Sequence, residues 1–202
     1  ACRYASNMEI IRRYYKCLCD QKRTGVNSQE IYKIELLMNQ AGITPSSRPV
    51  VNAALEKSAK NGDKPAVAIE LEDGTIVTGK TGDLLGAASS ALLNALKQIA
   101  GIDDSVDLLS PESISPIQTL KTNYLGSRNP RLHTDEILIA LSSSVVANPL
   151  ADKALKQIPK LYACDVHSTV ILSAVDKDTF KRLGMNLTCE PAYEEEKRFH
   201  KN

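Results

Sequence analysis

The sequence predicts an α/β fold in which a helical N-terminal segment precedes a mixed sheet with helices packed on it. Apolar residues first recur every three or four positions, which is the period of an amphipathic helix. From about residue 63, short apolar, β-branched runs alternate with helical patterns, and the turn signal Asp73-Gly74 separates the first two runs. The 202 residues are enough to bury a core without disulfides or metals. We therefore expect a helical subdomain at 1–62 and an α/β domain at 63–202.

The helical subdomain contains the pattern of three helices. Residues 8–18 keep their apolar side chains on one face. Asn27 and Glu30 have the spacing of a capping box, which predicts that a second amphipathic helix begins there and continues through 31–41. A third helix is expected at 50–60.

The α/β domain should contain five strands and five helices. The expected strands are 66–71, 75–78, 106–109, 169–172 and 185–189, and the expected helices are 83–99, 117–124, 134–146, 150–158 and 176–183. Thr134 is positioned to cap the third of these helices and Asp176 the last. The helix that begins at Thr134 is apolar almost all round, which predicts burial on several sides.

Composition narrows the class of protein. The 25 basic and 24 acidic side chains leave a formal net charge of +1, so no general attraction to nucleic acid or to an anionic membrane is expected. No apolar run approaches membrane-spanning length, and no signal segment opens the chain. The five cysteines lack the spacing of a disulfide framework, which favours a reducing, cytoplasmic location. Because the chain starts at Ala1 and enters a helical pattern at once, we expect it to be a fragment of a longer protein.

Residues 74–81, GTIVTGKT, have the spelling of a phosphate-binding P-loop. A P-loop must curl so that its backbone N–H groups surround the phosphate. The four middle residues here form a β-branched run that prefers an extended strand, and Gly74 already serves the hairpin turn. We therefore interpret the string as the return strand of a hairpin.

Polar side chains gather in the loop before the helix at Thr134. A helix N-terminus with basic residues beside it is a favourable place for an anion, and polar loops often carry function. The predicted residues for a small polar, nucleotide-like ligand are Lys121, Ser127, Arg128, Asn129 and His133, with His167 expected nearby. The alternative is an ordinary capped helix with a solvated loop, because Asp135 and Glu136 already occupy the first turn.

Cys164 and His167 have C-x-x-H spacing but no second pair of ligands, so no metal site and no cofactor are predicted. If this stretch is extended, the two side chains point to opposite faces. They remain the candidates for catalysis, although no third group is identified that would orient a Cys–His pair. The alternative interpretation makes Cys164 and Cys189 buried, small apolar residues.

Several strings along the chain match one family: MEIIRRYY (8–15), VAIEL (67–71), DGTIVTGK (73–80), LKT (120–122), LGSRNP (125–130), HTDEILIALS (133–142), NP (148–149), HSTVILS (167–173) and LG (183–184). Over nearly its whole length the chain resembles the uncharacterised bacterial family called domain of unknown function 1846. Members are longer, and the resemblance is to their C-terminal portion. It implies a missing N-terminal portion that carries a glycine-rich, phosphate-loop-like segment in members. The family brings no established activity.

The α/β domain also resembles, more weakly, the cytidine-deaminase-like fold. The shared order is a hairpin, an Ala-rich helix ending in LLNAL (92–96) and a strand ending at Ser110-Pro111. Deaminases place a zinc ligand and a Glu at the start of that helix, and P-C-x-x-C after the strand. Here the corresponding stretches read GDLLGAAS (82–89) and PESIS (111–115) and hold no zinc ligand. The resemblance therefore implies the fold without zinc deaminase chemistry.

Two hypotheses of function follow. In the first, the chain is the C-terminal domain of a cytosolic enzyme that binds a small polar ligand. In the second, it is a non-catalytic assembly domain, whose helices at 8–18 and 31–41 pack against the missing N-terminal portion or against a second subunit in a homo-oligomer. The two hypotheses are compatible.

Overall fold

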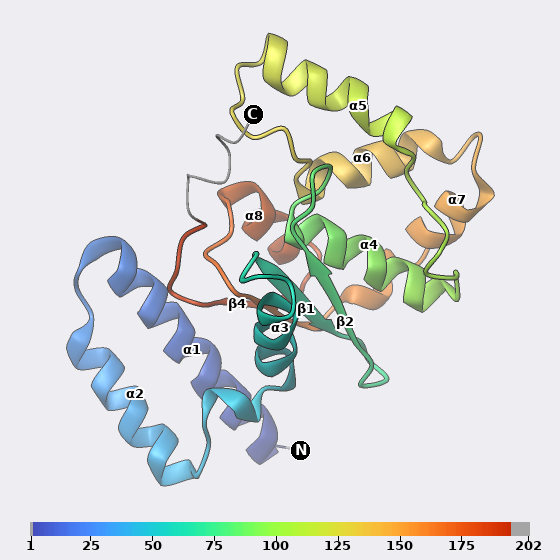
Figure 1. Cartoon of the computed structure of the whole chain (residues 1–202). Coiled ribbons are helices and arrows are strands. Elements are labelled where there is room, and N and C mark those ends of the chain that lie inside the picture. The colour runs from blue at the N-terminus through green and yellow to red at the C-terminus, as the bar shows by residue number, and fades with distance from the viewer. Residues whose placement is uncertain (1, 195–202) are drawn as a thin grey trace.

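A mixed sheet lies at the centre of the computed structural model, which describes residues 2–194 (Figure 1). Within these residues the sheet has four strands in the order β2-β1-β3-β4. The strands are β1 (Ala66–Glu70), β2 (Ile76–Lys80), β3 (Asp165–Ser168) and β4 (Asn186–Cys189). β1 is antiparallel to both β2 and β3, and β3 is parallel to β4. The predicted α/β class with a mixed sheet is confirmed.

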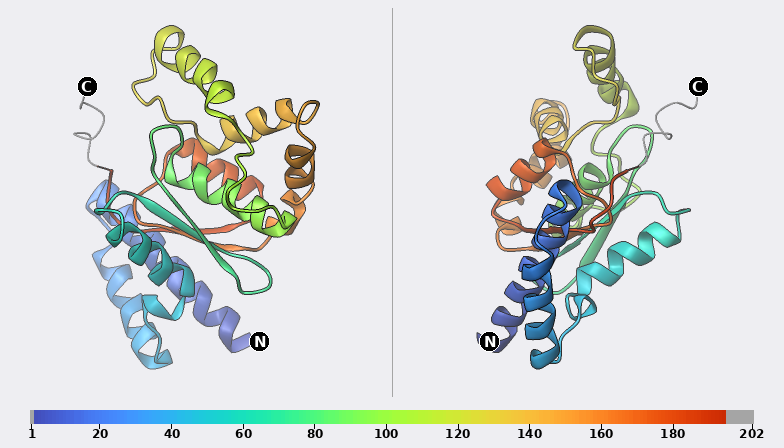
Figure 2. Two further views of the ribbon diagram at one scale, coloured as in Figure 1. Left: turned by 45° about the vertical axis from the view of Figure 1, so that its right-hand side comes forward. Right: turned by 90° about the vertical axis from the view of Figure 1, so that its left-hand side faces the viewer.

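Helices cover both faces of the sheet (Figure 2). One face carries α1 (Cys2–Thr24), α2 (Ser28–Ala41) and α3 (Pro49–Ala59), and a short 3₁₀ turn at Pro45–Ser47 lies between α2 and α3. The other carries α4 (Ala87–Ala100), α6 (Thr134–Ser144), α7 (Pro149–Leu155), a 3₁₀ turn at Ile158–Leu161 and α8 (Ala174–Arg182). Helix α5 (Pro111–Thr119) and the π-helical turn Leu120–Tyr124 project beyond α6.

Strand β1 shows why this sheet is buried on both faces. Successive side chains of a strand point to opposite faces. Val67 and Ile69 join the large apolar core beneath α4, whereas Ala68 packs against Val50 and Ala54 of α3. A strand covered on both faces needs apolar residues on both of them, and this explains the apolar run from Ala66 to Ile69.

The start of α2 differs from prediction in the side chains that cap it. Asn27 precedes α2 in the left-handed conformation, with a φ of 90°, and its side chain forms no capping hydrogen bond. The predicted capping box with Glu30 is therefore wrong. The chain turns here through two left-handed residues, Gly25 and Asn27, and this conformation directs the Asn27 side chain away from the first turn. The helix itself is present, and Ile31 N donates to Asn27 O at 3.0 Å.

Two predicted strands are wrong. Residues 106–109 form a loop, and Leu108 and Leu109 are buried against the core without pairing to another strand. Residues 169–172 also form a loop, because strand β3 ends at Ser168, directly before them. There His167 and Ser168 are buried polar residues, so the apolar run alone located the strand too late. The final strand, β4, is confirmed.

Three helices also depart from prediction. Helix α5 begins at Pro111, where Ser110 caps it, and not at residue 117. Ser173 caps α8 in place of Asp176, since its Oγ accepts from Asp176 N at 3.1 Å. Helix α6 is less buried than its composition suggested, because Ile139 is 66% exposed.

The P-loop spelling belongs to a hairpin, as interpreted from the sequence. Gly74 has a φ of 81° in the turn, and residues 76–80 are strand β2. Gly79 has a separate role, because a Cβ there would overlap the backbone of Ala91 in α4. Glycine therefore permits the close approach of β2 to α4.

Candidate functional site

Among the described residues, helices α4, α6 and α8 all begin around one small cavity of about 120 Å³. Its polar lining side chains are Asn129, Arg131, His133, Ser173, Asp176, Thr81 and Glu194. Helix N-termini present backbone N–H groups without intrahelical partners. Here side chains bond two of them, because Thr134 N donates to Asp176 Oδ1 at 2.9 Å and Asp176 N donates to Ser173 Oγ at 3.1 Å.

Leu132 fixes the segment that carries His133. Its backbone pairs with Leu84 and Leu85 in a short parallel bridge, and Leu132 N donates to Leu84 O at 3.0 Å. Ser89 Oγ of α4 donates to Leu132 O at 2.8 Å. The Leu132 side chain is 1% exposed, so the segment is held by both backbone and packing.

His133 is paired with Asp176 at the wall of the cavity. The distance from His133 Nδ1 to Asp176 Oδ2 is 3.1 Å. The other oxygen, Oδ1, accepts from the backbone N and the Oγ1 of Thr134, both at 2.9 Å. Ser173 Oγ donates to Oδ2 at 2.8 Å. An ionised carboxylate can only accept, so the imidazole proton lies on Nδ1, and Nε2 has no hydrogen-bond partner among residues 2–194.

The two members of this pair shift each other's pKa. The hydrogen bond to Asp176 raises the pKa of His133 above its usual value, and partial burial opposes this effect. Burial by itself would raise the pKa of Asp176, but hydrogen bonds from His133, Thr134 and Ser173 outweigh it and lower that pKa. Asp176 therefore remains ionised and holds the imidazole ring in one orientation.

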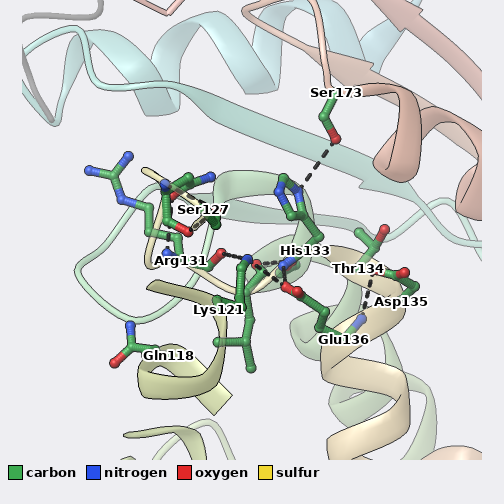
Figure 3. Close-up of polar contacts among 12 residues, drawn as sticks. Gln118, Lys121, Ser127, Arg131, His133, Thr134, Asp135, Glu136 and Ser173 are labelled. Carbon is green, nitrogen blue, oxygen red and sulfur yellow. Dashed lines mark hydrogen bonds and ion pairs between the residues drawn. The ribbon is translucent and has the colours of Figure 1, made fainter. Parts of the chain in front are cut away.

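Ser173, His133 and Asp176 do not form a nucleophilic triad. Ser173 Oγ lies 3.4 Å from the same Nδ1 that faces Asp176 (Figure 3). In a triad the nucleophile meets Nε2 while the acid holds Nδ1. Ser173 here helps to fix the carboxylate, and its hydroxyl does not contact Nε2.

Lys121 supports the loop from within. It is 6% exposed, and its Nζ donates to Arg131 O at 2.6 Å and to Glu136 Oε2 at 2.7 Å. The same Glu136 oxygen accepts from His133 N at 2.7 Å, so an ion pair and a helix cap share one atom (Figure 3). Lys121 thus contacts the segment that carries His133 and does not line the cavity.

The other predicted ligand residues separate into two groups. Asn129 lines the cavity beside His133, and its Oδ1 accepts from Arg131 N at 3.1 Å. Ser127 Oγ bonds within the loop, to Asn129 O at 3.1 Å, and Arg128 is exposed outside the cavity lining. The structure therefore brings Asn129 and His133 together at the cavity.

Sequence reasoning missed Ser173 and Asp176 as residues of this site and left Arg131, one of the basic residues beside the helix start, out of the predicted ligand set. Arg131 lines the cavity while its Nε donates to Gly82 O at 2.8 Å and its Nη1 to Glu194 Oε1 at 3.1 Å. The S-x-x-D spacing of Ser173 and Asp176 is a helix-start signal and could have located that helix cap. No local pattern indicates that Asp176 meets His133.

His167 lies on the other face of the sheet, so the expectation that it is near the polar loop is wrong. Side chains alternate along β3, and Val166 joins the core under α4 while His167 packs against Tyr15 of α1, with ring centroids 4.8 Å apart. Its Nδ1 lies 2.8 Å from Thr188 Oγ1 and its Nε2 lies 3.1 Å from Glu190 Oε1. Burial lowers the pKa of His167.

Cys164 and His167 point to opposite sides, as the alternation of an extended stretch requires. Cys164 belongs to the core beneath α4 and is buried, and so is Cys189. Over residues 2–194, no group of three or more His, Cys, Asp and Glu side chains is arranged to hold a metal ion. Within the same range, no helix is long and apolar enough to cross a membrane.

Two family models match the chain in succession. The model described as domain of unknown function DUF1846, C-terminal, matches residues 46–199. The model for the N-terminal part of the same family matches residues 1–42. The boundary between them falls just before α3, the helix that packs on β1.

Curated relatives match over the full chain. A UPF0371 protein of Corynebacterium diphtheriae is 53% identical over 201 residues, which is 100% of this chain and 40% of the relative. A UPF0371 protein of Corynebacterium efficiens is also 53% identical over 200 residues. One from Streptococcus pyogenes is 46% identical over 197 residues, covering 98% of this chain and 40% of the relative. The chain thus spans about 40% of the length of these relatives.

Proposed function

The chain belongs to the family described as domain of unknown function DUF1846, a description that assigns no reaction, and from its geometry we propose that it is a domain of an enzyme that binds a small polar ligand at the His133 cavity. The observation that carries the proposal is the His133–Asp176 pair at the cavity wall. An imidazole held at Nδ1 by a carboxylate can accept or donate a proton at Nε2. His133 is then the acid–base group, and Asp176 is its positioning residue.

The size of the cavity limits what it encloses. Pockets that enclose a drug-sized ligand usually measure roughly 300–1,000 Å³. At about 120 Å³, this cavity takes a single polar group, such as a phosphate, a carboxylate or a hydroxyl-bearing end. The rest of a nucleotide-like ligand would extend outward, past Asn129 and Arg131. The starts of three helices and the Arg131 side chain favour an anionic group, and the Asp176 and Glu194 carboxylates of the same lining oppose it.

We propose the deaminase-like topology as a description of the fold and not of the chemistry. It is supported by the β1–β2 hairpin followed directly by α4, which packs on it. The next strand of that resemblance was expected to end at Ser110-Pro111, and residues 106–109 are a loop. The proposal therefore includes no zinc chemistry and no cofactor. A reducing, cytoplasmic location is likewise proposed, and the five free cysteines support it.

The test uses the full-length protein, purified gently from its source and examined by native mass spectrometry. We expect a retained small molecule with a phosphate or carboxylate group, lost in His133→Gln and kept in Arg128→Gln. Arg128 is the matched control because it lies in the same loop but is exposed outside the cavity. Loss in Arg128→Gln with retention in His133→Gln would place the ligand on the outer face of the loop and overturn the proposal.

Assembly is a second candidate, favoured by the outer face of α2. Tyr32 is 63% exposed, Leu36 is 43% exposed and Leu37 is 49% exposed, although all three are large and apolar. Ile31, Ile34 and Met38 of the same helix are buried. We propose that the exposed face packs in a homo-oligomer of the longer protein. Light scattering on the full-length protein tests this, and a monomer, or an oligomer unchanged by Tyr32→Glu with Leu36→Glu, contradicts it.

A further inference from the structure

A second and larger cleft lies along the edge of the sheet. It measures about 410 Å³ and shares no lining residue with the His133 cavity. Its walls are the edge strand β2, one side of α4 and the loop before α5. This volume falls in the range of pockets that enclose a whole small molecule.

The charged lining of this cleft is mostly cationic. Lys57 comes from the last turn of α3, Lys80 from the end of β2 and Lys97 from α4. Among the described lining residues, these three lysines face one acid, Asp107. Lysines from three separate elements therefore converge on one concave surface, and an anion in the cleft would be attracted by all of them.

Lys97 is the most informative of the three. It is 7% exposed, and its Nζ donates to Asp104 O at 2.7 Å. It forms no ion pair with a carboxylate among residues 2–194. An ammonium has three protons to donate, and burying it with few partners costs free energy. A bound anion would accept from this ammonium and pair with its charge.

The remaining lining is apolar with a few neutral polar groups. Leu85, Leu93 and Ile114 form an apolar wall. Asn94 also lines the cleft, and its Nδ2 donates to Thr78 O at 3.0 Å, which fixes the amide. A ligand that satisfies both parts of the lining has an anionic group and an apolar body.

We propose that this cleft binds an organic anion. Its phosphate or carboxylate group is held by Lys57, Lys80 and Lys97, and its apolar body lies against the apolar wall. The geometry that carries the proposal is the convergence of the three lysines on one open cleft, together with a buried ammonium that forms no ion pair among residues 2–194. This cleft and the His133 cavity share no lining residue, so the two proposals are tested separately.

The test is calorimetric titration of the full-length protein with phenyl phosphate, benzoate and phenol, which share a ring and differ in charge. We expect saturable binding of an anion and much weaker binding of phenol. Binding should weaken by about tenfold or more in Lys57→Gln with Lys80→Gln, because hydrogen bonds to charged groups are the strong ones. Phenyl phosphate should also protect Lys57 and Lys80 from acylation in a labelling experiment read by mass spectrometry.

A double variant at two exposed lysines elsewhere, Lys153→Gln with Lys181→Gln, removes the same charge and should leave binding unchanged. Equal losses in the two double variants would mean general charge attraction and overturn the proposal. So would phenol binding as tightly as the anions, or no saturable anion binding at all. Preference between phenyl phosphate and benzoate identifies which anionic group the cleft takes. The tested lysines lie at the rim and not in the core, so the result does not depend on truncating Lys97.

Discussion

His133 and Asp176 lie 43 positions apart in the sequence, and the imidazole Nδ1 of one meets the carboxylate of the other at 3.1 Å where α6 and α8 begin. The pair joins two helix starts and fixes the orientation of the imidazole ring. Its strength can be measured through the protonation of the ring, because the hydrogen bond raises the pKa of His133.

We expect the histidine resonance that disappears in His133→Gln to titrate with a midpoint above about 6.5, the usual histidine value. Replacing Asp176 by Asn should lower that midpoint, since the partner charge is lost. NMR titration of the full-length protein with labelled histidine measures both. A midpoint at or below the usual value in the unaltered protein would show that the ion pair is absent in solution.

The same shift sets the sign of a pH effect on stability. A group whose pKa is raised in the folded state contributes stability that is complete below its unfolded pKa and is lost as pH rises through the folded value. Asp176→Asn should therefore cost more stability near about pH 6 than near about pH 8. Denaturant unfolding at the two pH values tests the sign, and an equal cost at both would argue that the contribution is not ionic.

Asp176 should also be important for folding, because its carboxylate accepts several hydrogen bonds while 7% exposed. Asp176→Ala leaves Thr134 N and two hydroxyls without their acceptor, which should cost about 3 kcal/mol in the free energy of unfolding. The matched control is Asp178→Ala on the same helix, whose exposed ion pair with Arg182 is worth less than about 1 kcal/mol. Similar costs for the two variants would contradict the network.

The sequence located the elements best where one local pattern decided them. Residues 66–71 form an apolar run before Asp73-Gly74, and both the strand and the turn are present. Residues 106–109 have a similar apolar character, yet they form a buried loop. A short apolar run has the same sequence pattern whether it pairs as a strand or is buried as a loop. Only the position of neighbouring strands distinguishes them, and that is a tertiary property.

The candidate site shows the same limit. His133 and Asn129 were predicted because they lie in one polar loop, and they do line the cavity. Asp176 comes from a distant helix start, so no spacing could indicate it. The buried Arg48, outside this cavity, was missed for the same reason. Its guanidinium donates to Val166 O at 3.1 Å and to Asp165 Oδ1 at 3.0 Å, residues 118 and 117 positions away.

Gly79 should be necessary for packing and not for phosphate binding. A Cβ there would overlap the backbone of Ala91, so Gly79→Ala forces β2 away from α4 and should cost about 2 kcal/mol or more. Gly82→Ala is the control, because nothing lies within 4 Å of its Cβ position and its φ is not in the left-handed range. Unfolding of both variants by denaturant measures the difference. A Gly79→Ala protein of unchanged stability would contradict the close contact.

His167 should make the docking of α1 sensitive to acid. Burial lowers its pKa, so the unfolded state takes up a proton first as pH falls, and stability decreases below about pH 6.5. The groups around the ring are Tyr15 of α1, Thr188, Glu190 and Arg48, and Glu190 partly opposes the shift by its hydrogen bond.

Hydrogen exchange of the α1 backbone in the full-length protein tests this effect, since Tyr15 Oη donates to Glu190 at 3.0 Å and links that helix to the sheet. We expect exchange in α1, corrected for its intrinsic pH dependence, to accelerate between about pH 7 and about pH 5, and to do so less in His167→Gln. Helix α7 lies on the other side of the sheet and serves as the internal reference. An acceleration that is the same in both helices, or unchanged by His167→Gln, would assign the acid sensitivity to the carboxylates and not to this histidine.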